Sequence, residues 1–154
     1  MRRPRSFIYF EMHNSKNQLT LAELKFSYTI YPQLLKLHNT QQANDLFLKI
    51  WEQECQCKEQ KRYVLFLDYD EQLITWKHLP NSLNIAHEIA AMALACNAKG
   101  IIISHNRLNY PKPNFADKTL VTKTFRICEC MMIEILDYLI ITPNECVSYK
   151  ASIL

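Results

Sequence analysis

Apolar and polar residues follow two different periods along the chain. Between residues 24 and 30 they alternate, which is the pattern of a half-exposed strand. Over residues 43–57 apolar side chains recur three and four positions apart, after a candidate helix cap at Asn39, so this segment predicts an amphipathic helix. The apolar runs at 63–67 and 73–76, joined by a polar turn, predict a β-hairpin with a buried first strand.

The middle of the chain predicts a helix, a short strand and a loop. Residues 85–96 carry apolar side chains on one helical face, and Gly100 is expected to break this helix. The apolar triplet 101–103 predicts a core strand that delivers residues 104–106 into a proline-containing loop at 110–114. Candidate capping residues precede the helix at Asn81, Ser82 and Asn84.

The last third predicts one helix and two strands. The helix runs from Asp117 to about Met132, and the strands occupy 136–142 and 147–149. The resulting order is β-α-β-β-α-β-α-β-β, in which strands that form hairpins separate the helices. We therefore expect an α/β fold of the α+β type, with a mixed β-sheet flanked by helices. The inner stripe of the last helix is predicted to carry Leu120, Thr124, Ile127, Cys128 and Met131.

The composition is that of one compact domain. Of 154 residues, 49% are hydrophobic and 21% are charged, which supplies a single core, and we assign this domain to residues 21–154. Residues 1–20 are expected to form a flexible, irregular arm with a turn at 14–17. One glycine and six prolines exclude a collagen-like or linker-like chain. Two carboxylates interrupt the longest apolar stretch, at 131–141, so no membrane span is expected.

The charge pattern gives no independent sign of a nucleic-acid partner. The net charge is only +3, and the densest basic cluster lies at the N-terminus, where we interpret it as a solvated tail of Arg2, Arg3 and Arg5. No secretory signal follows these residues, so a cytoplasmic location is expected. Core packing is expected to explain most of the tyrosines at strand and loop positions, which are Tyr28, Tyr31, Tyr63, Tyr69, Tyr110, Tyr138 and Tyr149.

The six cysteines are expected to be free thiols. Two Cys-x-Cys pairs, at 55/57 and 128/130, have a shorter spacing than zinc-binding thiolates usually show. On a helix, Cys128 and Cys130 would also face apart, which argues against a shared metal site. Cys96 lies among small apolar residues and is interpreted as a buried hydrophobe.

Five segments carry a family resemblance. Residues 22–28 resemble a first strand and 64–68 a buried strand, while 87–98 match the helix before a metal-binding strand. Residues 101–106, Ile-Ile-Ile-Ser-His-Asn, and 136–141, Leu-Asp-Tyr-Leu-Ile-Ile, match two further stretches. Together they resemble the small RadC-type proteins, the bacterial branch of the JAB/MPN (JAMM) metallopeptidase fold. The resemblance implies the cytidine-deaminase-like architecture of that fold.

The same resemblance implies a zinc site whose ligands are only partly present. The JAMM signature has a glutamate, then His-x-His, seven residues, a serine, two residues and an aspartate, with both histidines and the aspartate on zinc. His105 matches the first histidine and Asp117 the aspartate, but Arg107 stands at the second histidine. Arginine stays protonated and has no lone pair to donate to a metal.

The remaining positions of the signature also differ. The loop is one residue shorter than in the family, and the expected serine aligns with Asn114. The catalytic glutamate aligns with Gln60, an amide that exchanges no proton near neutral pH, or with Glu59 if the register shifts by one.

The two matched ligands also have structural interpretations. Asp117, three residues after Asn114, can lie in the first turn of its helix and face the positive end of the helix dipole. His105 can be a hydrogen-bonded structural histidine at a strand end. Because Arg107 is two residues further along the strand, it should point to the same side as His105. Its guanidinium would then fill the metal position and pair with Asp117.

The resemblance thus implies a non-catalytic RadC-like JAB domain, a pseudo-enzyme that acts as a binding or scaffolding module without a cofactor. Its family name links it to DNA repair. The alternative is a zinc-dependent metallopeptidase or hydrolase with Glu59 as base, His105 and Asp117 as ligands, and a third ligand such as His87 or a cysteine. A further alternative is a structural relic without enzymatic activity.

The partner class stays open between a protein and DNA. A sheet edge at residues 22–30, or the arm over 1–20, could add a strand to another chain. The sequence predicts no particular oligomeric state.

Overall fold

The chain divides into two units, Met1–Pro32 and Gln33–Leu154. The computed structural model describes residues 13–15, 18–20, 36–37, 39–54, 60–80 and 83–150. The predicted strand at 24–30 lies outside these residues, so the domain boundary at residue 21 stays a prediction.

The first unit contains a short β-hairpin that the hydrophobic pattern did not predict. Its strands are β1, His13–Ser15, and β2, Gln18–Thr20, which pair antiparallel. Residues 13–15 and 18–20 are therefore not irregular, and Asn14 and Ser15, which were expected in the turn, belong to a strand. Backbone hydrogen bonds define so short a hairpin, and they leave no periodic trace in the side chains.

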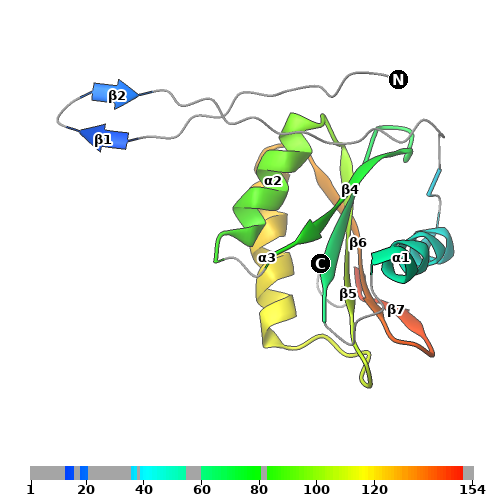
Figure 1. Cartoon of the computed structure of the whole chain (residues 1–154). Coiled ribbons are helices and arrows are strands. Elements are labelled where there is room, and N and C mark those ends of the chain that lie inside the picture. Colours follow the sequence, from blue (N-terminus) through cyan, green and yellow to red (C-terminus); the bar gives the residue numbers. More distant parts are fainter. Residues whose placement is uncertain are drawn as a thin grey trace. The chain divides into compact units, whose positions relative to one another are not determined.

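The second unit is built on a five-stranded mixed sheet (Figure 1). Its strand order is β4-β3-β5-β6-β7, and only β5 and β6 pair in parallel. The predicted mixed sheet is confirmed, including the β3–β4 hairpin and the final strand pair. The strands are β3, Arg62–Leu67; β4, Leu73–Leu79; β5, Gly100–Asn106; β6, Glu134–Ile141; and β7, Cys146–Ser148.

Helices cover both faces of this sheet. α2, Ile85–Ala95, and α3, Phe115–Cys130, lie together on one face, and α1, Thr40–Glu54, lies on the other (Figure 1). Alternation along the strands divides the core between the two layers. Leu65, Ile102 and Leu139 belong to the cluster under α1, whose helical members include Ala43, Phe47 and Ile50. The buried Val64, Phe66, Ile101 and Ile103 therefore point toward α2 and α3.

The start of α1 agrees with the predicted cap. The side-chain oxygen of Asn39 accepts a hydrogen bond from the backbone N–H of Gln42 at 2.9 Å, as an N-cap does. The predicted end of this helix at Cys57 lies outside the described residues, as do Cys55 and two of the cap candidates of the next helix, Asn81 and Ser82.

Gly100 does not break α2, contrary to the prediction. The helix ends at Ala95, and two residues later Asn97 adopts a left-handed conformation with φ 56°. Gly100 is already the first residue of β5. Asparagine tolerates this conformation better than most residues. A Cβ at Gly100 would lie 2.6 Å from Cδ1 of Leu136, so the glycine leaves room for the Leu136 side chain of β6.

Two further boundaries differ from the prediction. Residues 104–106 belong to β5 itself, and α3 begins at Phe115, two residues before Asp117. Within α3, Cys128 is buried and Cys130 is exposed, which confirms that these thiols face apart. Leu120, Thr124 and Cys128 of the predicted stripe are buried, whereas Ile127 and Met131 are only partly buried and Met131 follows the helix end.

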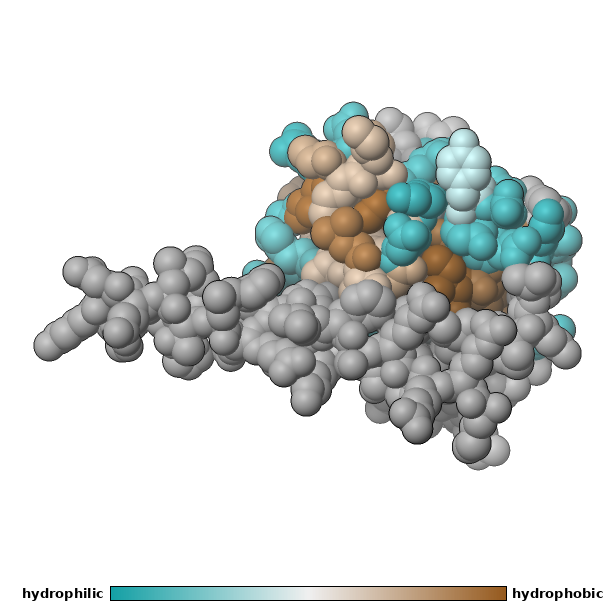
Figure 2. Space-filling model, turned by 90° about the horizontal axis from the view of Figure 1, so that it is seen from above, coloured by the Kyte–Doolittle hydropathy of each residue, from teal (hydrophilic) through white to brown (hydrophobic). Residues whose placement is uncertain are grey.

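Surface hydropathy is mixed in the view from above, with apolar patches next to hydrophilic ones (Figure 2). Within the ranges that the structure describes, no helix is long and apolar enough to cross a membrane.

The end of α3 contains a strained residue. Met132 adopts φ 56° and is 89% exposed, while the N–H of Ile133 donates to Cys128 O at 3.0 Å across the helix end. We expect Met132→Gly to stabilise the fold by about 0.5–1 kcal/mol, because glycine adopts this conformation without a Cβ clash. Urea denaturation measures the free energy of unfolding of this variant. Met132→Ala is the control, because alanine keeps a Cβ and therefore retains the strain. Equal stability of the two variants would contradict the assignment.

Candidate functional site

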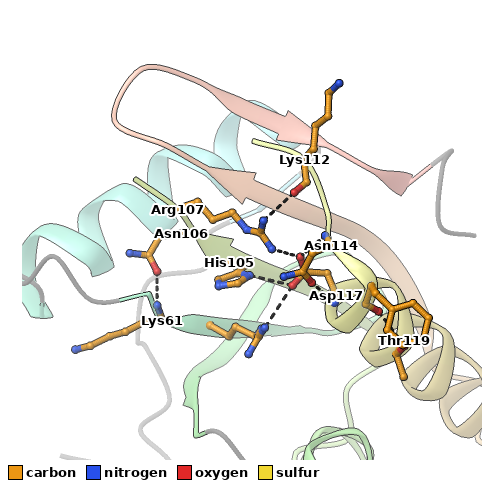
Figure 3. A network of polar contacts seen from close by, with 10 residues as sticks. Lys61, His105, Asn106, Arg107, Lys112, Asn114, Asp117 and Thr119 are labelled. Carbon is orange, nitrogen blue, oxygen red and sulfur yellow. Dashed lines mark hydrogen bonds and ion pairs between the residues drawn. The ribbon is translucent and has the colours of Figure 1, made fainter. Parts of the chain in front are cut away.

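The candidate site lies where β3 begins, β5 ends and α3 begins. Arg62 and His105 are directly paired across β3 and β5, so their side chains lie on the same face of the sheet. Alternation from Ile101 and Ile103 places His105 on the face that α2 and α3 cover. The first turn of α3 carries Asp117 to this point (Figure 3).

Asp117 is the centre of the cluster and is fully buried. Its Oδ1 lies 3.0 Å from Nδ1 of His105 and 3.4 Å from Nη2 of Arg62. Its Oδ2 accepts hydrogen bonds from Nη2 of Arg107 and, at 2.9 Å, from the backbone N–H of Asn114. Both carboxylate oxygens are thus engaged by at least two donors each.

Asn114 and Asp117 also form a capping box. The Asn114 side-chain oxygen accepts from the backbone N–H of Asp117 at 2.9 Å, while Asp117 binds the Asn114 N–H in return. The local sequence Asn-x-x-Asp at a helix start produces this pair by itself. The structural interpretation of Asp117 as a first-turn residue is therefore confirmed.

Arg107 connects the cluster to the loop that follows β5. Its Nη1 donates to the backbone oxygen of Lys112 at 2.9 Å, and its Nη2 donates to Asp117 (Figure 3). The Tyr149 hydroxyl donates to the backbone oxygen of Pro111. The loop from Arg107 to Asn114 is held at its start, its middle and its end.

Electrostatics favour an ionised Asp117 and a neutral His105. Burial by itself raises the pKa of Asp117, but the hydrogen bonds from His105 and the Asn114 backbone outweigh it and lower this pKa far below its ordinary range. Burial lowers the pKa of His105, and the charges of Arg62 and Arg107 add to this, while Asp117 opposes it. A neutral His105 donates its Nδ1 proton to Asp117.

Burial also raises the pKa of Tyr138, and the nearby Asp117 carboxylate raises it further. The phenol therefore stays protonated beside the cluster. One buried carboxylate faces two guanidinium groups, so the site carries a net positive charge.

The structure brings together four of the residues that the sequence singled out. His105, Arg107, Asn114 and Asp117 all belong to the cluster, and the predicted Arg107–Asp117 pair is present. The side-chain oxygen of Asn114, aligned with the family serine, is used in the capping box.

Three other candidates lie elsewhere or cannot be placed. Gln60 is exposed just before β3, His87 is exposed on α2, and Glu59 lies outside the described residues. Arg62 was missed by the sequence analysis. Arg62 lies beside His105 because β3 pairs with β5, although the two residues are 43 positions apart in the sequence.

The donor set does not fit a zinc ion. Arg62 and Arg107 lie within ion-pair distance of the carboxylate that would be a ligand, and their charges repel a dication. Nδ1 of His105 is committed to the same carboxylate. Among the residues that the structure describes, no three His, Cys, Asp or Glu side chains are grouped so that they could hold a metal.

Comparison with known proteins gives one family. The model of the RadC-like JAB domain matches residues 37–154. UPF0758 proteins of Haemophilus influenzae strains 86-028NP and PittEE are each 33% identical to this chain over 97 residues. The matched region is 59% of this chain and 44% of each relative, so the chain spans less than half the length of these curated relatives.

Loss of the Arg107 guanidinium should destabilise the fold. Its side chain is 12% exposed, and Arg107→Ala leaves a buried carboxylate with fewer donors, so we expect a loss of about 1–3 kcal/mol in the free energy of unfolding. Lys150→Ala is the control, because it breaks an exposed pair with Glu134 at 3.9 Å and should cost less than about 0.5 kcal/mol. Equal, small effects of both variants would refute a structural role for the Arg107–Asp117 pair.

His105 should make stability depend on pH. Because its pKa is lower in the folded state than its ordinary 6.5, the unfolded chain binds the proton first as the pH falls. Stability should therefore be full above pH 6.5 and decline below it, by up to about 1 kcal/mol per pH unit.

Denaturation series across this range should show a weaker decline in His105→Gln than in the wild type. His87→Gln, which removes an exposed histidine of α2, should keep the wild-type slope. The ionised Asp117 contributes a separate loss that begins only below its ordinary pKa of about 3.9. An unchanged slope in His105→Gln would show that His105 is not the titrating group.

Proposed function

The chain belongs to the RadC-like JAB domain family, and we propose that it is a non-catalytic member that acts as a binding or scaffolding module. In this proposal the ion-pair cluster around Asp117 stands where the JAMM signature has its zinc. The family resemblance suggests a link to DNA repair, and it leaves a protein partner equally open.

The single observation that carries the proposal is the Arg107–Asp117 ion pair. Arg107 occupies the position of the second histidine of the signature, and its guanidinium contacts the carboxylate of the predicted aspartate ligand. A guanidinium keeps its charge at any accessible pH and offers donors only. Zinc binding would require Asp117 to exchange these hydrogen bonds for the metal while two cations stay close.

The catalytic positions support the same interpretation. Hydrolysis of the JAMM type needs a carboxylate as general base, and the aligned Gln60 has no group that titrates near neutral pH. Asn114, aligned with the serine, uses its side-chain oxygen to cap α3. The alternative, zinc-dependent hydrolysis with Glu59 as base, also needs a third ligand besides His105 and Asp117.

Zinc content separates the two functions. Tag-free protein purified without chelator should contain less than about 0.1 zinc per chain, and His105→Ala should contain the same amount. The mutant controls for metal bound by the cysteines. Near one zinc per chain, lost in His105→Ala, together with zinc-dependent peptide hydrolysis, would overturn the proposal in favour of the hydrolase.

A restored ligand gives a second test of the same site. Arg107→His supplies the missing histidine of the signature and removes the competing cation, so its zinc content should exceed that of the wild type. Arg107→Gln is the matched control, because it removes the cation without adding a good ligand. If Arg107→Gln gained as much zinc as Arg107→His, the metal would not be held in the geometry of the signature.

A further inference from the structure

Two aromatic rings are exposed next to the Asp117 cluster. Tyr110 is 59% exposed in the loop after β5, and Phe115 is 85% exposed as the first residue of α3. Core packing therefore does not explain Tyr110, contrary to the expectation from the sequence. Tyr69, in the turn between β3 and β4, is 87% exposed as well.

A cation lies beside the Tyr110 ring. Nζ of Lys112 lies 5.6 Å from the centroid of the Tyr110 ring, a cation–π distance. Residues 104–116 contain no aspartate or glutamate. The set of charged residues at this end of the domain comprises the exposed Lys112 and Lys118, Lys61 before β3, the Arg62 and Arg107 guanidiniums paired with the buried Asp117, and Glu145 after β6.

The turn around Tyr69 provides a contrast within the same molecule. It lies at the opposite end of the β3–β4 hairpin from Arg62, and its neighbours Asp68, Asp70 and Glu71 are acidic. Exposed rings therefore occur at both ends of the sheet, but Tyr69 has acidic neighbours whereas Tyr110 and Phe115 have the lysines Lys112 and Lys118 close in sequence.

The loop that carries Tyr110 is fixed by the rest of the structure. Arg107 binds Asp117 and the Lys112 backbone, Tyr149 binds Pro111, and Asn114 caps α3. Rings on a loop held at these points lose little conformational freedom when a ligand stacks on them. The Asp117 cluster thus preorganises the exposed rings.

We propose that Tyr110 and Phe115, with the cations around them, bind single-stranded nucleic acid. Exposed rings stack on the faces of bases, which are accessible only in single strands, and the exposed Lys112 and Lys118 contact the phosphates. An acidic peptide would satisfy the cations but leave the rings without a planar partner. The inference rests on the proposed binding function, and it names single-stranded nucleic acid as the partner that binds next to the Asp117 cluster.

Fluorescence anisotropy with labelled oligothymidylate of about 12 nucleotides, a length that one small domain can cover, tests the inference on the full chain. Tyr110→Ala/Phe115→Ala should weaken binding by about 10-fold or more, because the variant loses both rings that stack on bases. The control Tyr69→Ala removes an equally exposed ring and should bind like the wild type. All variants keep the basic N-terminal residues, so binding by these residues cancels in the comparison.

A second variant keeps the test decisive if the ring variant loses its fold. Lys112→Ala/Lys118→Ala should reduce the slope of log affinity against log salt by about 0.7 for each phosphate that the variant no longer neutralises, measured between about 50 and 200 mM salt. Lys99→Ala/Lys123→Ala removes two cations that do not belong to the set around the two rings and should leave the slope unchanged. Thermal melts of each variant confirm that it is folded.

Further probes identify the nucleic acid. Oligouridylate of the same length distinguishes RNA from DNA, and the proposal holds whichever of the two binds more tightly. A duplex of the same length should bind more weakly than the single strand. Equal binding of single strand and duplex, or equal competition by polyglutamate of matched charge, would overturn the inference in favour of charge alone.

The inference and the proposed function fail in different ways. Oligonucleotide affinity that is unchanged in both Tyr110→Ala/Phe115→Ala and Lys112→Ala/Lys118→Ala overturns the nucleic-acid inference, whatever the zinc content is. Near one zinc per chain with hydrolysis overturns the non-catalytic function, even if the rings bind the oligonucleotide.

Discussion

The buried carboxylate of Asp117 is the constraint on which this end of the domain depends. A fully buried charge is costly unless it is paired and hydrogen-bonded, and here it receives donors from β3, β5, the loop after β5 and the helix start itself. Each donor belongs to a different part of the chain. Satisfying one anion therefore fixes the positions of two strands, one loop and one helix relative to each other.

In the proposed non-catalytic function, the same arrangement holds the fold in place of a metal. A dication held by Asp117 would bring two positive charges to the carboxylate, and the guanidiniums of Arg62 and Arg107 bring two as well. They differ from a metal in what they can do. A guanidinium donates hydrogen bonds and neutralises charge, but it offers no open coordination position at which a water could be activated. The cluster can thus replace the structural role of an ion and not its chemistry.

The two faces of the sheet differ in where their buried charged groups lie. Beneath α1 the strands contribute a largely apolar cluster, and the buried Asp137 of β6 is satisfied there by the hydroxyls of Thr40 and Ser148. On the other face, the buried charged groups gather at the strand ends, where His105 and Arg62 meet α3. The proline-containing loop begins at this charged end, so its exposed rings lie next to the Asp117 cluster.

The sequence by itself determined those features that depend on neighbouring residues. Hydrophobic spacing predicted α1, the β3–β4 hairpin, α2, β5, α3 and the last two strands, because each period is set within one element. The Asn114–Asp117 spacing predicted a first-turn position for Asp117, and the two-residue spacing of His105 and Arg107 predicted that Arg107 lies on the side of His105 and pairs with Asp117.

Tertiary structure decided what depends on distant residues or on exposure. Arg62 enters the cluster only because β3 pairs with β5, and no local pattern encodes that register. Gly100 was expected to break a helix, but its role is set by Leu136 on the neighbouring strand. Tyr110 is exposed in a loop whose backbone is bound by the distant side chain of Tyr149 and by Arg107. Local periodicity shows which side of a helix or strand is apolar. It does not show which other element packs against that side, because this depends on residues far away in the sequence.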